Sequence, residues 1–176
     1  GHMNTINQVV GQEVVIKTVL DRDLDKCKAF FGDSVHCTDN FDEILNDDDI
    51  SIIVELIGYV PAAKDYISQA LAAGKHVVSA NKDLVALHGK ELVTLAKANK
   101  CDFLYEAAVA GGVPILRAIT ESFASDNIQK VMGIVNGTTN FMMTKMDKEG
   151  YSYDEALALA QELGFAEKNP TSDVDG

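Results

Sequence analysis

Residues that could bind or transform a ligand gather in four short segments of this 176-residue chain. The first segment is Ser79-Ala80-Asn81-Lys82. Its lysine could donate a proton or hold a substrate oxygen, and its asparagine could hydrogen-bond a ribose or a carboxamide. The segment also lies at the end of a predicted parallel strand, where open α/β sheets bind their ligands. The residue types alone are equally compatible with a polar turn that caps the next helix.

The second segment, residues 105–114 (YEAAVAGGVP), combines a carboxylate with small residues. Glu106 follows a predicted strand, and the pair Gly111 and Gly112 leaves backbone carbonyl groups uncovered. A carboxylate beside free carbonyl oxygens suits a hard or monovalent cation, or a polar ligand. The alternative is a glutamate paired with a nearby lysine and an ordinary glycine turn.

Two further segments lie closer to the carboxyl end. Residues 136–140 (NGTTN) pass from a predicted strand into a helix, where hydroxyls and amides could bind an anionic or zwitterionic ligand or simply cap the helix. The segment 164–175 places Glu167 and Asp173 just after a helix that Gly164 ends. These carboxylates could bind an ammonium group and orient a general acid, although surface loops also carry carboxylates.

Apolar and β-branched runs predict the elements that must position these segments. Strands are predicted at 13–20, 50–56, 76–79 and 103–105, and helices at 24–31, 41–45, 62–73 and 89–99. This alternation predicts an α/β fold, an open parallel sheet with helices on both faces. Residues 4–11 are too few for a strand, a glycine-rich turn and a helix, so we expect them to be the tail of a helix.

The pattern changes to an α+β unit after Pro114. It predicts a helix at 115–122, a strand at 128–135, and helices at 138–148 and 153–163. The last helix has the clearest boundaries, because Ser152 and Glu155 are spaced as a capping box and Gly164 follows its end.

Composition excludes several classes of protein. The net charge of -12 argues against nucleic acid as a partner, since basic patches supply nonspecific affinity for phosphates. No stretch reaches the roughly 18 uncharged apolar residues that a membrane span needs, and no signal-peptide pattern opens the chain, so we expect a cytoplasmic protein. Cys27, Cys37 and Cys101 lack zinc-ligand spacing and are expected to be reduced thiols. The acidic run at 46–49 is interpreted as a solvated turn rather than a metal site.

Taken together, the four segments resemble the homoserine dehydrogenase family. The distinctive motifs are VVSANK at 77–82, YEAAVAGGVP at 105–114, GIVNGTTN at 133–140 and GFAEKNPTSDVDG at 164–176. The resemblance implies a truncated Rossmann-like parallel sheet that binds NAD or NADP, over 4–114, followed by a partial α+β catalytic and dimerisation domain over 115–176. It also implies NAD(P)-dependent interconversion of L-aspartate 4-semialdehyde and L-homoserine, in threonine, methionine and isoleucine biosynthesis, by a homodimer.

The resemblance further implies roles for individual residues. Asn81, Lys82 and Gly164 are expected to contact the cofactor, with Lys82 also transferring a proton, and Glu167 and Asp173 are expected to bind the substrate. A monovalent cation, Na⁺, is expected at a site formed by Glu106 with backbone carbonyls. These carbonyls belong to Val109, Gly111 and Val113. All these loops are expected to converge into one crevice.

Departures from the family pattern leave other interpretations open. The glycine-rich phosphate loop does not precede Glu13, and the family's later catalytic aspartate and lysine would follow Gly176, so we expect a fragment with little dehydrogenase activity and poor NAD(P) binding. Normal turnover by the purified chain would contradict this expectation. Asp21 suits the ribose hydroxyl of NAD while Arg22 suits the phosphate of NADP, and the sequence does not separate them.

Two rival functions remain at this point. An aldehyde dehydrogenase acting through a thiolate would need a reactive cysteine at the site, and no cysteine lies in the four segments. A noncatalytic scaffold that only folds and dimerises is the alternative, since exposed apolar surface is expected and dimerisation could cover it.

Overall fold

The structure, a computed structural model, describes residues 2–166. It divides into two compact units, Gly1–Val109 and Ala110–Gly176. The first unit alternates short parallel strands with helices, and the described part of the second contains helices and a connecting stretch without regular structure. The predicted α/β class, with parallel pairing, is therefore confirmed, while the boundaries of the functional domains stay a prediction.

The strands of the first unit form two parallel ladders instead of one sheet. Strand β1 (Thr18–Leu20) pairs with β2 (His36–Thr38), and β4 (His76–Ser79) lies between β3 (Ile52–Glu55) and β5 (Phe103–Leu104). No strand in the described part of the chain joins β1 to β3, so the hydrogen-bond ladder is interrupted there. In a doubly wound sheet, consecutive strands are added outward in both directions from a central strand. The orders β1–β2 and β3–β4–β5 match the two halves of such a sheet. Strand β2 was not predicted, because three residues give too short a pattern.

Five α-helices of the described chain belong to the first unit: α1 (Met3–Val10), α2 (Leu24–Phe31), α3 (Asp42–Leu45), α4 (Val60–Ala72) and α5 (Lys82–Ala98). Helix α1 agrees with the expected helix tail. Helix α5 begins at Lys82 and not near Gly89, where the sequence suggested its start. Gly89 lies inside this helix, where glycine costs about 1 kcal/mol relative to alanine and does not by itself end the helix.

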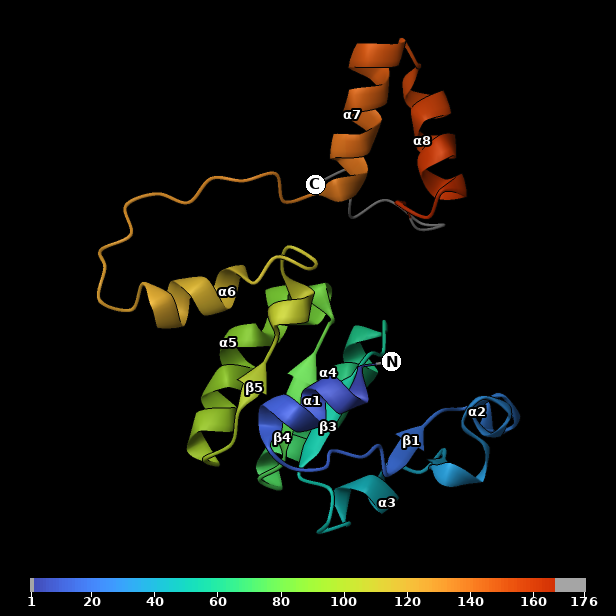
Figure 1. Ribbon diagram of the computed structural model, residues 1–176, viewed down its shortest axis with the longest axis vertical. Helices are drawn as coiled ribbons and strands as arrows, with labels where there is room; N and C mark the ends of the chain where they lie inside the picture. The colour runs from blue at the N-terminus through green and yellow to red at the C-terminus, as the bar shows by residue number, and fades with distance from the viewer. Residues whose placement is uncertain (1, 167–176) are drawn as a thin grey trace. The chain divides into compact units, whose positions relative to one another are not determined.

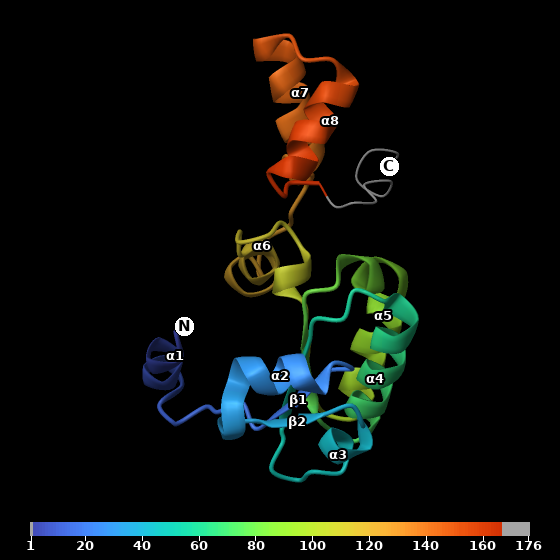
Figure 2. The same ribbon diagram turned by 90° about the vertical axis from the view of Figure 1, so that its right-hand side faces the viewer.

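Helices α4 and α5 lie side by side on one face of the β3–β5 ladder (Figures 1 and 2). Ile67 of α4, Val77 of β4 and Leu92 of α5 are almost fully buried between these layers. The opposite face is different, because Ile52 and Val54 are 55% and 61% exposed. The expectation of helices on both faces is therefore wrong for this ladder in the part of the chain that the structure describes.

The second unit is built on a helical hairpin. Helix α7 (Gly137–Glu149) packs beside α8 (Tyr153–Glu162), as both views show (Figures 1 and 2). Met142 packs against Ala156 and Ala160 between the helices, where small side chains allow close approach. The capping box predicted at Ser152 and Glu155 is present. A short helix, α6 (Ile115–Arg117), continues into a π-helical turn at Ala118–Ser122, as the predicted helix at 115–122 requires.

The strand predicted at 128–135 is wrong. The chain from 127 to 136 has no ladder in the described structure, and Val131 and Ile134 are 63% and 78% exposed. The residue types favour a strand, but a strand also needs a neighbouring strand to hydrogen-bond with its backbone. No such neighbour occurs among the described residues.

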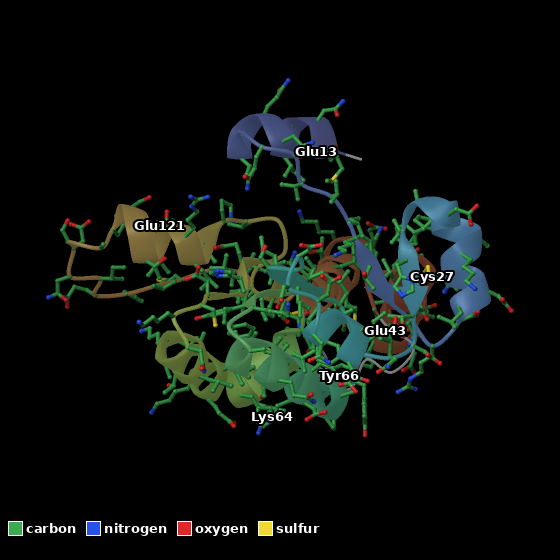
Figure 3. All side chains as sticks on the ribbon, turned by 90° about the horizontal axis from the view of Figure 1, so that it is seen from below. Glu13, Cys27, Glu43, Lys64, Tyr66 and Glu121 are labelled. Atoms are coloured by element: carbon green, nitrogen blue, oxygen red, sulfur yellow. A yellow bond between two sulfur atoms is a disulfide. The ribbon has the colours of Figure 1, made fainter. Side chains whose placement is uncertain are left out.

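Cys27 and Cys37 form a disulfide, so the expectation of reduced thiols is wrong for this pair (Figure 3). Helix α2 returns the chain to β2 within ten residues and brings the two Cα atoms to 6.1 Å. That proximity comes from the β1–α2–β2 fold and could not be inferred from cysteine spacing. Cys101 is a free thiol, as expected, and its burial raises its pKa.

Candidate functional site

The carboxyl ends of β3 and β4 meet at one edge of the sheet, because the two strands are parallel and Glu55 is directly opposite Ser79. Both side chains are buried, at 4% and 0% exposure. Ser79 Oγ donates a hydrogen bond to Glu55 Oε2 at 2.6 Å, and the backbone N–H of Ile57 donates to Glu55 Oε1 at 2.6 Å. Both carboxylate oxygens are therefore satisfied within the protein, as burial requires.

Asn81 extends this network to the next helix. Its backbone N–H donates to Ser79 Oγ at 3.1 Å, and its Nδ2 donates to the carbonyl of Ile57 at 2.7 Å. Its Oδ1 accepts the backbone N–H of Leu84 at 3.0 Å, which makes Asn81 the N-cap of α5. The helix-cap interpretation of this segment is thus confirmed, and contact between Asn81 and a cofactor stays a prediction.

Lys82 is the first residue of α5 and is exposed. The amino end of a helix of this length carries a partial positive charge and unpaired N–H groups. An ammonium group beside it adds a full positive charge. This edge of the sheet therefore fits an oxygen-rich or anionic ligand, which is the chemistry expected of a dinucleotide.

The loop after β1 holds the two residues that bear on the choice of cofactor. Asp21 Oδ1 accepts the N–H of Asp23 at 2.9 Å, and Asp23 caps α2 by accepting the N–H of Lys26 at 3.0 Å. Arg22 lines a shallow surface depression together with the first residues of α2. One oxygen of Asp21 thus serves the turn, and the geometry leaves both NAD and NADP possible.

The segment around Glu106 is a turn. Glu106–Ala108 forms a single 3₁₀ turn, and the carbonyl of Glu106 accepts the N–H of Val109 at 3.1 Å. Beyond it, Gly111 has a φ of 60°, a left-handed conformation that favours glycine. The carbonyl of Val113 accepts the N–H of Ile115 at 2.8 Å. Carbonyl oxygens have two lone pairs, so these bonds are compatible with the predicted cation contacts, which stay a prediction.

The segment 136–140 acts as a helix cap in the second unit. Asn136 Oδ1 accepts the N–H of Thr139 at 3.0 Å at the start of α7. The buried Thr138 donates its hydroxyl to the carbonyl of Phe165 at 2.6 Å. Gly164, at a φ of 77°, ends α8 in the left-handed conformation. The capping interpretation is confirmed, and the expected ligand contacts of Gly164 stay a prediction.

Two expected substrate-binding residues, Glu167 and Asp173, lie outside the described residues. The expected convergence of these residues and Lys82 into one crevice therefore stays a prediction.

The acidic run at 46–49 is engaged in ion pairs. The Lys17 ammonium lies 2.7 Å from Asp47 Oδ2 and 2.8 Å from Asp49 Oδ2. These contacts raise the pKa of Lys17 and lower that of Asp47. The run is a surface turn that attaches to the start of β1, in line with its interpretation from the sequence.

Sequence reasoning missed Glu55. It considered the strand 50–56 only as a buried apolar run, although a carboxylate within such a run must find hydrogen-bond partners. A charged residue type within a buried apolar run is therefore the feature of the sequence that could have drawn attention to Glu55 and its partner Ser79.

Two family models match the chain. "Homoserine dehydrogenase, NAD binding domain" covers residues 3–106, and "Homoserine dehydrogenase" covers residues 114–176. No described helix is long and apolar enough to span a membrane.

Curated relatives cover nearly all of this chain. The homoserine dehydrogenase of Lactococcus lactis is 51% identical over 174 residues, covering 97% of this chain and 40% of the relative. That of Bacillus subtilis is 49% identical and covers 99% of this chain and 40% of the relative. The chain therefore spans about two fifths of the length of these relatives.

Solved structures agree with this similarity. A homoserine dehydrogenase from Thiobacillus denitrificans superposes with a TM-score of 0.89 at 41% identity, covering 97% of this chain and 39% of that chain. A hyperthermophilic archaeal homoserine dehydrogenase in complex with NADPH gives a TM-score of 0.73 at 28% identity, covering 99% of this chain and 50% of the other.

Proposed function

Because the chain belongs to the homoserine dehydrogenase family, we propose that it contributes nucleotide-binding and substrate-binding segments to an NAD(P)-dependent homoserine dehydrogenase. The observation that carries the proposal is 51% identity to the Lactococcus lactis enzyme over 174 residues, which cover 97% of this chain. The polar edge at the ends of β3 and β4 supports it, since ligands of open α/β sheets bind at such edges.

The chain's own residues have the following proposed roles. Asn81 and Lys82 contact the cofactor beside the amino end of α5, and Gly164 contacts it where cofactor and substrate meet. Glu167 binds the amino group of the substrate, and Asp173 belongs to the same substrate loop. Charge-assisted hydrogen bonds between a carboxylate and an ammonium group suit this task.

The reaction reduces the aldehyde of L-aspartate 4-semialdehyde to the alcohol of L-homoserine. When bound, the nicotinamide supplies the hydride that adds to the aldehyde carbon. The Lys82 ammonium stabilises the negative charge that develops on the aldehyde oxygen and donates a proton to it. In the reverse direction, the neutral amine of Lys82 removes the proton from the hydroxyl.

The cofactor is proposed to be NADP or NAD. The archaeal neighbour's complex with NADPH supports the phosphorylated form, and Arg22 offers a cation for that phosphate. Asp21 in the same loop offers a partner for an unmodified ribose. An Arg22→Ala variant therefore should raise the KM for NADPH more than the KM for NADH if NADP is the natural cofactor.

A monovalent cation, Na⁺, is proposed near Glu106, with carbonyl oxygens from Val109, Gly111 and Val113 as further ligands. Hard cations prefer such oxygen donors. The test compares activity in sodium with activity in a bulky organic cation, for the parent and for Glu106→Gln. A sodium-dependent rate in the parent that the variant loses would support the site.

The remaining proposals concern assembly and setting. Membership of the family supports the proposal of a cytoplasmic homodimer that acts in threonine, methionine and isoleucine biosynthesis. Light scattering tests the dimer directly, and a strict monomer at high concentration would argue against it.

The activity test supplies the rest of the enzyme from a relative. In a hybrid, this chain replaces the matching 174-residue segment of the Lactococcus lactis homoserine dehydrogenase. We expect homoserine-dependent reduction of NADP⁺ or NAD⁺ and loss of that activity in Lys82→Met. The unmodified relative is the control.

Two outcomes discriminate enzyme from scaffold. A folded, dimeric hybrid that turns over homoserine supports the proposal. A folded, dimeric hybrid that binds neither cofactor nor homoserine in calorimetric titrations contradicts it and favours the noncatalytic scaffold.

A further inference from the structure

Glu55 is the one carboxylate that the structure buries among the residues it describes. It is the last residue of β3, at the edge of the sheet where the proposed cofactor residues begin. Its burial opposite Ser79 is unfavourable unless both oxygens are hydrogen-bonded, and they are. An apolar residue at this position would leave the Ile57 N–H and the Ser79 hydroxyl without these acceptors, so the carboxylate does more than fill space.

Ser79 links Glu55 to Asn81 through its hydroxyl. The single hydrogen of the Ser79 hydroxyl is donated to Glu55 Oε2. A lone pair of the same oxygen is then left to accept the backbone N–H of Asn81 at 3.1 Å. Glu55 thereby holds the backbone of Asn81 through Ser79.

The same carboxylate holds the neighbouring loop. Its other oxygen accepts the N–H of Ile57, and the carbonyl of Ile57 accepts Nδ2 of Asn81 at 2.7 Å. The loop after β3 and the loop after β4 are therefore joined into one closed ring of hydrogen bonds. The ring also fixes the start of α5, because Asn81 Oδ1 caps that helix.

We propose that Glu55 is a positioning residue for cofactor binding, which acts through Ser79 and Ile57 to hold Asn81 and the amino end of α5. The inference rests on the proposed function, since Asn81 and Lys82 are the residues proposed to contact the cofactor. A group held by buried partners keeps its binding geometry before the ligand arrives, and small displacements of such groups weaken binding strongly.

The first test uses hydrogen exchange of backbone amides in the 176-residue chain, by NMR. Glu55→Met keeps a side chain of similar length but has neither acceptor oxygen. It can accept neither the Ile57 N–H nor the Ser79 hydroxyl. We expect exchange to accelerate about tenfold at the amides of both Ile57 and Asn81.

A second variant separates the two branches of the ring. Ser79→Ala removes the hydroxyl and leaves the carboxylate, so Asn81 should lose protection while Ile57 keeps it. Ile67→Val is the matched control, because it removes a buried methyl group from α4 without touching the ring. Any change in the exchange rates of the Ile57 and Asn81 amides should be no larger than the change at other amides of the sheet.

The second test measures kinetics in the hybrid enzyme described above. We expect Glu55→Met to raise the KM for the cofactor about tenfold and to change kcat less than about twofold, since the ring affects binding geometry. Ser79→Ala should raise the same KM, and the double variant should be little worse than Glu55→Met alone, because both act in one network. Ile67→Val should leave the KM unchanged.

The outcomes are separable. Unchanged exchange at Asn81 in Glu55→Met, or a cofactor KM that matches that of Ile67→Val, would overturn the positioning role. A hybrid without any activity would refute the proposed function instead, and the exchange pattern would then decide whether Glu55 holds Asn81.

Discussion

The hydroxyl of Thr138 lies 2.6 Å from the carbonyl oxygen of Phe165 and donates a hydrogen bond to it. Thr138 is in the first turn of α7, and Phe165 follows α8. The aromatic ring of Phe165 also stacks on that of Phe141, with the centroids 4.6 Å apart. The open end of the α7–α8 hairpin is therefore closed by one partly buried hydrogen bond and one ring contact.

Replacing Thr138 by valine should loosen this end of the hairpin. The shape is preserved, but the Phe165 carbonyl loses its donor in a partly buried hydrogen bond, which costs about 1 kcal/mol. Hydrogen exchange in α7 and α8 should accelerate accordingly. Thr144→Val is the control, because Thr144 is exposed and bonds only to its own helix at Asn140. Equal effects of the two variants would contradict the role of Thr138.

The Cys27–Cys37 bond should stabilise the first unit. It closes a loop with a sequence separation of 10, and a loop of this size contributes about 2 to 3 kcal/mol in the chain-entropy treatment. Urea unfolding followed by circular dichroism should shift to lower urea when a phosphine reductant is added. The Cys27→Ser, Cys37→Ser double variant should not respond to reductant. Alkylation of three thiols in the untreated, denatured chain would contradict the pairing.

Asn81 should contribute to stability in two separable ways. Asn81→Asp keeps an oxygen to cap α5 and loses the Nδ2 donor to Ile57, so it should cost about 1 kcal/mol. Asn81→Ala loses both interactions and should cost about 2 kcal/mol. Urea unfolding of the three chains measures both steps. A result in which aspartate and alanine cost the same would show that the cross-link to Ile57 carries the whole effect.

The capping box should make α8 sensitive to acid. The backbone N–H and hydroxyl of Ser152 both donate to Glu155 and lower its pKa from the ordinary value of 4.5. Because the folded pKa is the lower one, the stabilisation is present above pH 4.5 and is lost as the pH falls through the folded pKa. Exchange of the amides in the first turn of α8 should show this loss between neutral and acidic pH. Glu155→Gln keeps an acceptor without a charge and should show no such change.

Local rules in the sequence predict most elements of this fold. Helix α4 begins at a proline turn and α8 at a capping box, and both were located within two residues because their boundaries depend on adjacent residues. Strand β4 has the predicted bounds, because glycine and charged residues flank its apolar run in the sequence. The start of α5 was missed, since Gly89 was interpreted as a boundary when it is an interior residue.

Features that depend on distant partners could not be predicted in this way. The disulfide needs the return of β2 beside α2, and the strand at 128–135 needs a neighbour that the pattern of its own residues does not specify. The candidate site likewise combines residues that local sequence predicts with a residue whose role depends on a distant partner. Asn81 and Lys82 were found because they follow a strand, whereas the contribution of Glu55 emerges only when β3 and β4 are paired in register.

The stretch from 127 to 136 has a practical consequence for anyone who handles this protein. Ile128, Val131 and Ile134 are exposed within a backbone free to form a ladder, which is the profile of a segment that seeds cross-β fibrils. Lys130 and Gly133 interrupt the apolar run and act as gatekeepers against such stacking. High salt screens the repulsion between stacked lysines, so concentrated stocks will keep longest in dilute buffer.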